Sequence, residues 1–142
     1  MVICADKDIA SAQRTAELII SRGGKAIAWQ CDVSVSRDVQ AMAIAAPSLL
    51  DGPVNLLINN AGVGLGGGLA DLSLEQWQWC LDINLWGVIY GCHYFLPQLK
   101  ENSVSGLINV ASAASFGSLP DMAAYNVSKA GVLSLSETLH AE

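Results

Sequence analysis

The chain has 142 residues, which suffices for one domain with a sizeable core, and 52% of them are apolar while only 14% are charged. A formal net charge of −6, with 7 lysines and arginines spread along the chain, argues against binding to nucleic acid. The sequence shows no apolar run of the roughly eighteen residues that a bilayer span needs, no secretory signal and no metal-ligand spacing of cysteine and histidine. We therefore expect a cytoplasmic protein with reduced thiols, no membrane contact and no metal site.

Short apolar runs alternate with amphipathic segments along the chain. Strands are expected at 2–5, 25–31, 54–58 and 106–111, and helices from residue 9 to the Gly23-Gly24 pair, over 39–50, over 73–97 and over 121–142. Ser73 is expected to cap its helix, because Gln76 three residues later completes a capping box. The alternation predicts one α/β domain over residues 1–142, with a parallel sheet covered by helices on both faces.

Three groups suited to acid–base chemistry lie close together in the sequence between residues 109 and 129. Tyr125 and Lys129 are four residues apart, so on a helix they share one face and the ammonium lies near the phenol. Ser112 follows the expected strand 106–111, where a strand end could approach that helix. A lone Tyr-x-x-x-Lys pair often arises by chance, so other features must support this interpretation.

A glycine-rich loop follows the third expected strand. It contains Gly62, Gly64 and Gly67 in G-x-G-x-x-G spacing, which is also found in loops that bind the pyrophosphate of a dinucleotide. Such a loop opens directly into a helix, whereas here the next helix is expected only at Ser73. We therefore do not interpret these glycines as a pyrophosphate site.

Four features together resemble the short-chain dehydrogenase/reductase family, in its order and at compatible spacings. They are the segment Asn59-Asn60-Ala61-Gly62 after a strand, Asn84 within a helix, Ser112, and Tyr125 with Lys129. The resemblance covers essentially the whole chain and implies a Rossmann-like, doubly wound parallel sheet. The family's glycine-rich T-G-x-x-x-G-x-G start and its last strands have no counterpart here, so the chain resembles an internal piece with strands 2 to 5 of the full fold.

The absent first strand would lie between the strands expected at 2–5 and 54–58. We therefore expect a gap in the sheet, with unpaired strand edges and exposed apolar faces. We also expect these 142 residues to fold poorly alone and to bind a dinucleotide weakly.

The resemblance implies hydride transfer between a nicotinamide cofactor and a small secondary alcohol or ketone. Tyr125 would be the general acid and base, and Lys129 would stabilise its phenolate and bind the nicotinamide ribose. Ser112 would orient the carbonyl and stabilise its developing negative charge. Asn84 would bend its helix and hold a water on the proton path, although a hydrogen-bonded core asparagine is the simpler alternative.

The resemblance also implies cofactor contacts outside the catalytic group. Asp6, at the end of the first strand, would accept hydrogen bonds from the adenosine ribose, and its charge favours NAD over NADP. Alternatively, Asp6 or Asp8 only caps the following helix. Further cofactor neighbours would be Asp32 and Val33 at the adenine, and Asn59, Ala61, Gly62, Tyr125 and Lys129. For Asp32 a simple capping turn is an equally good interpretation, and the asparagines of the Asn59 segment would also tie the sheet together.

In the family, helices corresponding to 74–100 and 121–142 form subunit contacts, so a homodimer or homotetramer is expected. Trp77, Trp79 and Trp86 are then packing or interface residues. Phe116, Leu119 and Met122 suggest an apolar wall near the site.

Two other functions stay open. An inactive binding or scaffold protein of the family is disfavoured by the intact catalytic positions. A nucleotide-sugar epimerase or dehydratase of the extended branch also has Tyr-x-x-x-Lys. The short spacing from Ser112 to Tyr125, the Asn59 to Gly62 segment and Asn84 argue against that alternative.

Overall fold

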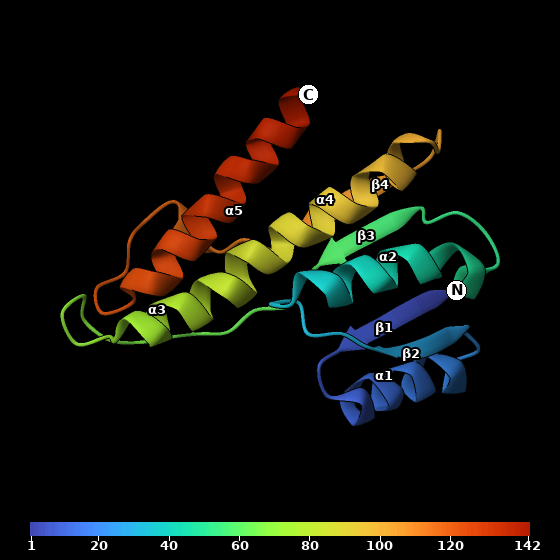
Figure 1. Cartoon of the computed structure of the whole chain (residues 1–142), viewed down its shortest axis with the longest axis horizontal. Coiled ribbons are helices and arrows are strands. Elements are labelled where there is room, and N and C mark those ends of the chain that lie inside the picture. The colour runs from blue at the N-terminus through green and yellow to red at the C-terminus, as the bar shows by residue number, and fades with distance from the viewer. The chain divides into compact units, whose positions relative to one another are not determined.

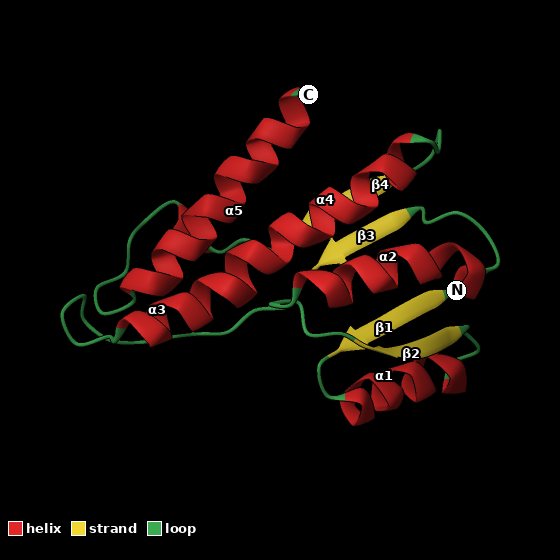
Figure 2. Ribbon diagram, viewed as in Figure 1, coloured by secondary structure: helices red, strands yellow, loops and turns green.

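Four strands and five α-helices alternate along the computed structural model, which describes residues 1–142 (Figures 1 and 2). The chain divides into two compact units: unit 1 comprises residues 1–56 and 90–106, and unit 2 comprises residues 57–89 and 107–142. Strands and helices follow one another as the apolar pattern predicts, so the α/β class is confirmed. None of the helices combines the length and the hydrophobicity that a membrane span requires.

Unit 1 opens with a strand, a helix and a strand: β1 (Val2–Asp6), α1 (Ile9–Ser21) and β2 (Ala26–Gln30). The strands pair in parallel, and α1 packs along both of them. Asp8 caps α1 by accepting a hydrogen bond from the Ala10 amide at 3.1 Å. The helix ends where Gly23 takes a φ of 82°, a left-handed conformation that glycine adopts without steric cost.

Helix α2 (Ser36–Leu50) completes unit 1, together with residues 90–100 of α4 (Gly87–Lys100). It begins three residues before the expected start at 39. Its buried residues share one helical face: Val39, Ala43 and Ala46. Within this unit, the Gln98 side chain donates a hydrogen bond of 2.8 Å to the Ala43 carbonyl and so joins α4 to α2.

Unit 2 contains nearly all of the second sheet and the helices that follow its strands: β3 (Leu56–Asn59), α3 (Leu74–Leu81), β4 (Gly106–Asn109) and α5 (Ala123–Ala141). The Val110 amide donates to the Asn59 carbonyl at 3.0 Å and so joins the carboxyl ends of the two strands. Helices α3 and α5 pack against each other, and the loops that precede them lie at the same end of the pair (Figure 1).

The strands form two separate two-stranded sheets, β1 with β2 and β3 with β4. β1 and β3, between which the resemblance places the missing strand, are not paired with each other. The exposed apolar surface expected from the missing strand is found on the second sheet, so within residues 1–142 this sheet is not covered on both faces. Apolar side chains that alternate along its strands are between 37% and 53% exposed: Leu56, Ile58, Ile108 and Val110.

The long helix expected from Ser73 to beyond Pro97 is helical throughout 74–100, but it is not α-helical over its whole length. Between α3 and α4 lies a π-helical turn, η1 (Asp82–Trp86), in which the Gly87 amide bonds to the Asp82 carbonyl five residues earlier. This wider turn carries Asn84 into the buried interior. A local distortion of this kind is set by tertiary contacts of one side chain, which hydrophobic periodicity does not report.

The strand expected over 106–111 is also shorter than predicted. β4 ends at Asn109, and the chain then forms a 3-10 helix, η2 (Ala113–Ser115). The side chain of Ser112 caps η2, which explains why the chain leaves the extended conformation at this point.

Candidate active site

Lys129 lies in the second turn of α5 and is only 4% exposed. Its ammonium donates a hydrogen bond of 2.8 Å to the backbone carbonyl of Val110, just beyond the end of β4. Burying an unpaired ammonium would be very costly, so this hydrogen bond determines where the side chain can point. The result is an ammonium 6.0 Å from the centre of the half-buried Tyr125 ring, on the same helix face.

Ser112 is positioned by the turn that follows β4. Its hydroxyl accepts a hydrogen bond from the Ala114 amide at 3.2 Å, as the cap of η2. The hydroxyl of Ser115, three residues later, accepts a hydrogen bond from the Ser112 amide at 3.3 Å and donates one to the Lys129 carbonyl at 2.8 Å. One hydroxyl thus connects the Ser112 backbone directly to the helix that carries Tyr125 and Lys129.

Asn84 is fully buried and its amide is hydrogen-bonded on both sides. The Oδ1 atom accepts from the Val63 amide at 2.7 Å, and Nδ2 donates to the Val63 carbonyl at 2.9 Å. Nδ2 also lies 3.1 Å from the hydroxyl of Ser128, which itself donates to the Tyr125 carbonyl. The amide therefore joins the loop after β3 to α5, which matches the simpler interpretation of a satisfied core asparagine.

Gly62 lies where only a residue without a side chain avoids a close contact. A Cβ atom there would be 3.2 Å from Oδ1 of Asn84 and 3.5 Å from the ammonium of Lys129. The backbone at Gly62, the side-chain amide of Asn84 and the ammonium of Lys129 consequently lie within contact distance of one position. The structure therefore brings together Gly62, Asn84 and Lys129, which are far apart in the sequence.

Asn59 ends β3 and ties it to the neighbouring strand, as expected for the first asparagine of its segment. Its side-chain amide donates to Oδ1 of Asn109 at 2.8 Å, and Nδ2 of Asn109 donates to the Ser136 hydroxyl of α5 at 3.0 Å. Ala61 and Gly62, which follow, are exposed. This leaves their backbone accessible to a ligand.

The remaining sequence candidates belong to unit 1. Asp6 ends β1, is exposed and accepts the Asp8 amide at 2.9 Å, while Asp8 is the residue that caps α1. The capping alternative thus applies to Asp8. Hydrogen bonds to the Ser11 hydroxyl, chiefly, and to the Ala10 amide lower the pKa of Asp8.

Asp32 forms the turn that sequence alone allowed as an alternative. Its carboxylate accepts both the amide and the hydroxyl of Ser34, at 3.0 and 2.6 Å. Val33 is half-buried beside it. Burial and the charges of Asp38 and Asp32 raise the pKa of the adjacent Cys31 to about 11, so this thiol is not a nucleophile near neutral pH.

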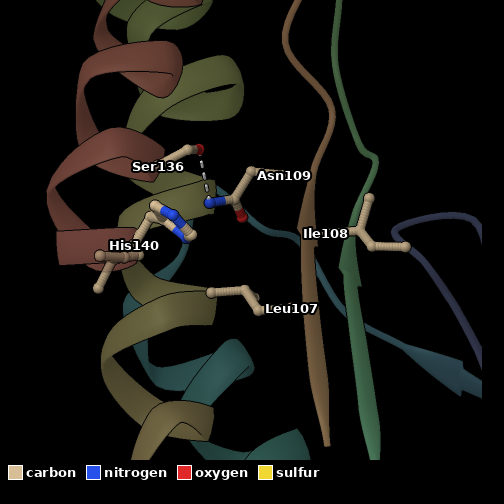
Figure 3. Close-up of a pocket in the computed structure, with 6 residues that line it drawn as sticks. Leu107, Ile108, Asn109, Ser136 and His140 are labelled. Atoms are coloured by element: carbon tan, nitrogen blue, oxygen red, sulfur yellow. Dashed lines mark hydrogen bonds between the residues drawn. The ribbon is translucent and has the colours of Figure 1, made fainter. Parts of the chain in front are cut away.

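A separate hollow of about 440 Å³ lies between β4 and the end of α5 (Figure 3). Leu107 and Asn109 point from β4 toward the helix, where Ser136 and His140 face them, and Ile108 points away. None of the residues lining this hollow belongs to the candidate catalytic group. Ser136 follows Lys129 by seven positions, which places the hollow roughly 10 Å further along α5. We therefore assign the candidate active site by the hydrogen-bonded side chains and not by this hollow.

Three positioning residues escaped the sequence analysis: Val63, Ser115 and Ser128. Each acts through a backbone group or a small hydroxyl at a point where the tertiary structure joins two segments. Serine is common in turns and on helices, and no sequence spacing distinguishes Ser115 and Ser128 from the other serines of the chain.

A family model described as short chain dehydrogenase matches residues 1–142. The chain belongs to the short-chain dehydrogenase family. Two curated relatives illustrate this membership. The chain is 37% identical over 142 residues to the probable oxidoreductase EphD of Mycobacterium bovis, and this match covers 99% of the chain and 24% of the relative. It is 36% identical over 136 residues to 3β-hydroxysteroid dehydrogenase 1 of Eggerthella lenta, covering 95% of the chain and 52% of the relative.

Solved short-chain dehydrogenases have the same fold. One from Burkholderia phymatum in complex with NAD superimposes with a TM-score of 0.91 at 40% identity, covering 96% of this chain and 49% of the other. A metagenomic short-chain oxidoreductase in complex with NADP gives 0.90 at 28% identity, covering 96% and 62%. The chain thus spans between a quarter and about three fifths of the lengths of these four proteins. The expected Rossmann-like class and the resemblance to this family of oxidoreductases are both confirmed.

Proposed function

We propose that the protein interconverts a secondary alcohol and a ketone by hydride transfer, with NAD as its nicotinamide cofactor. One observation carries the proposal: the buried ammonium of Lys129 is held beside the Tyr125 ring, on a helix that Ser115 joins to Ser112. A phenol beside a fixed ammonium is suited to exchanging a proton with a carbonyl or alcohol oxygen.

Each side chain would contribute a distinct action on the substrate oxygen. Tyr125 would donate its proton to that oxygen during reduction and take it back during oxidation. Lys129 would stabilise the phenolate that remains. The Ser112 hydroxyl accepts the Ala114 amide, and its own proton would be donated to the substrate oxygen.

The exposed backbone at Ala61 and Gly62 fits the cofactor that the family uses. A Cβ at Gly62 would crowd Oδ1 of Asn84 and touch the Lys129 ammonium, so this glycine would keep the loop backbone beside the ammonium open to a ligand. Lys129 and Tyr125 would contact the ribose beside the nicotinamide, and Asn59 and Ala61 would adjoin the same ligand. When bound, the cofactor would supply or accept the hydride at the substrate carbon.

The preference for NAD rests on Asp6. Its carboxylate is exposed at the end of β1, and the cap of α1 is formed by Asp8 instead. A carboxylate at this strand end would accept ribose hydroxyls and repel a 2′-phosphate. Asp32 and Val33 would contact the adenine.

Exposed aromatic residues support self-association. Trp79 and Trp86 are each 44% exposed on α3 and η1, and Val127 on α5 is 51% exposed. Large apolar side chains at this exposure are typical of protein interfaces. We propose that helices 74–100 and 121–142 contribute to a homodimer or homotetramer.

Replacing Tyr125 by Phe in the full-length protein tests the proposed reaction. Loss of the phenolic proton should lower NADH-dependent turnover of a ketone by at least roughly a hundredfold, while leaving NADH affinity unchanged. Steady-state kinetics and a fluorescence titration with NADH measure the two effects. Tyr94→Phe is the matched control, since it removes only the 2.8 Å hydrogen bond to Ser36 and should retain turnover. Retained turnover in Tyr125→Phe would remove this residue from the proposed role.

A further inference from the structure

Two loops of unit 2 are fastened to each other beside the candidate catalytic residues. The first follows β3 and covers residues 60–73, and the second covers residues 116–122, between η2 and α5. The Gly67 amide donates to the Asp121 carbonyl at 2.7 Å, and Gly67 forms a parallel bridge with Met122. Both loops lie at the end of α3 and α5 where these helices begin (Figure 1).

Three large apolar side chains on these loops are exposed to solvent: Leu69 at 72%, Phe116 at 82% and Leu119 at 52%. We call these residues the apolar trio. Leaving such side chains in water forgoes roughly 25 cal/mol for each Å² that could be buried. Their arrangement on two bridged loops therefore favours a role in binding an apolar ligand.

The apolar trio is held close in the chain to the proposed reacting groups. Phe116 is the C-terminal cap of η2, whose N-terminal cap is Ser112. The carbonyl of Leu119 accepts a hydrogen bond of 2.7 Å from the side chain of Asn126, which is only 8% exposed. Asn126 follows Tyr125 directly, so the second loop is anchored at both ends to segments that carry Ser112 and Tyr125.

The charges of unit 2 restrict what this surface can bind. Lys129 is the only lysine or arginine in residues 57–89 and 107–142, and it is buried. Six carboxylates belong to the same residues: Asp71, Glu75, Asp82, Asp121, Glu137 and Glu142. Asp71 and Asp121 belong to the two loops, and their carboxylate oxygens both lie within 3.7 Å of a Cβ position at Gly68. Within unit 2, a substrate bearing a carboxylate or phosphate would find no exposed lysine or arginine and would be repelled by these carboxylates.

We propose that the substrate is an uncharged ketone or secondary alcohol with an apolar carbon frame, bound against the apolar trio. This inference rests on the proposed function, because it assigns the substrate class of the same site. It predicts that anionic thioesters, keto acids and phosphorylated sugars bind less well than uncharged ketones of similar size. Asn126 acts as a positioning residue that keeps Leu119 beside the reacting groups.

A matched pair of ketones tests the substrate class in the full-length protein. The probes are 4-methylcyclohexanone and 4-oxocyclohexanecarboxylate at pH 7, which differ chiefly by one negative charge. Binding is measured by calorimetry with NAD⁺ present, an oxidised cofactor to which a ketone cannot transfer hydride. We expect the neutral ketone to bind at least roughly tenfold more tightly than the carboxylate. This is a typical difference in affinity when one ligand makes a few apolar contacts and the other carries a charge without a partner.

Variants assign the effect to the apolar trio. Phe116→Ala should weaken binding of the neutral ketone roughly tenfold. Phe116→Lys should reduce or reverse the difference in affinity between the neutral ketone and the carboxylate. Leu74→Ala is the control, because Leu74 is also 82% exposed in unit 2 but lies on the first turn of α3. Equal or tighter binding of the carboxylate, absence of binding by both ketones, or equal effects of Phe116→Ala and Leu74→Ala would overturn the inference. The expected binding pattern without any turnover would instead overturn the proposed function alone.

Discussion

Gly62 shows how one missing side chain controls the surroundings of Lys129. The Oδ1 atom of Asn84, 3.2 Å from a Cβ position there, is held by the Val63 amide at 2.7 Å and has no free direction in which to move. The ammonium of Lys129 is likewise held by the Val110 carbonyl. An added methyl group would therefore press on Oδ1 of Asn84 and come into contact with the Lys129 ammonium.

Gly62→Ala should therefore destabilise the protein by about 1–3 kcal/mol, the range for overpacking a close-packed site, and should also lower turnover. Urea unfolding of the variant, with kinetics on the same preparation, measures both effects. Gly64→Ala is the matched control, because no atom lies within 4 Å of a Cβ position at Gly64. If both alanine variants behave alike, the proposed crowding around Lys129 is wrong.

Asp8 provides a pH-dependent contribution to stability at the start of α1. The Ser11 hydroxyl, first, and the Ala10 amide lower the pKa of Asp8 in the folded state. A carboxyl group whose pKa is lower in the folded than in the unfolded state binds fewer protons when the protein is folded. Its contribution to the free energy of unfolding is therefore fully present at pH values above the unfolded pKa. The contribution is lost as the pH falls through the lower, folded pKa.

Asp8→Asn should therefore flatten the loss of stability in acid while keeping most of the cap at neutral pH, because an asparagine oxygen accepts the same amide. Urea unfolding at several pH values between 2 and 7 follows the effect. A variant whose stability falls in acid as steeply as that of the parent would show that Asp8 does not contribute in this way.

At the scale of the element, α3 begins with a complete capping box. The Ser73 hydroxyl accepts the Gln76 amide at 3.3 Å, and the Gln76 side chain accepts the Ser73 amide at 2.9 Å. This reciprocal pair satisfies two backbone donors that the helix cannot. The start of α3 is therefore determined locally, whereas its continuation into η1 depends on the contacts of Asn84.

Ser73→Ala should lower the free energy of unfolding by about 1 kcal/mol, since it removes the acceptor for the Gln76 amide. Thermal and urea unfolding measure the change. Ser103→Ala is the control, because Ser103 is exposed and lies outside every helix. A loss no larger than that of the control would mean that the capping box is not needed for α3.

At the scale of the whole chain, the two separate sheets leave apolar surface unpaired. β3 and β4 present Leu56, Ile58 and Ile108 to solvent at between 48% and 53% exposure, and each two-stranded sheet has open edges. Two strands form a marginal sheet unless other elements cover them. Residues 1–142 by themselves therefore lack much of the burial that makes unfolding cooperative.

Purified residues 1–142 should accordingly bind a hydrophobic dye, unfold without one sharp transition and bind NADH only weakly. The double variant Ile58→Ser with Ile108→Ser should reduce dye binding, because both side chains belong to the exposed face. Dye fluorescence, calorimetry and an NADH titration provide the three measurements. A sharp two-state melt together with micromolar NADH affinity would contradict this expectation.

The sequence alone determined the class of the chain and most of its elements. Apolar runs and amphipathic segments predicted four strands and the helices between them, because burial imposes a period of two on strands and 3.6 on helices. Caps and stops such as Ser73 and Gly23 were equally readable, since they act through neighbours within a few residues. The family resemblance depended on whole motifs, from Asn59 to Lys129.

Only the tertiary structure decided how those motifs meet. The contacts of Asn84 with Val63, of the Ser115 hydroxyl with Lys129 and of Gly62 with Asn84 and Lys129 each join residues at least fourteen positions apart. The exposed face of β3 and β4 was expected from the family resemblance, which indicated a missing strand. The apolar pattern could not have shown it, because an apolar strand has the same pattern whether or not a helix covers it. Local propensity acts over a few residues, whereas the environment of Lys129 is set by backbone groups and side chains that only folding brings together.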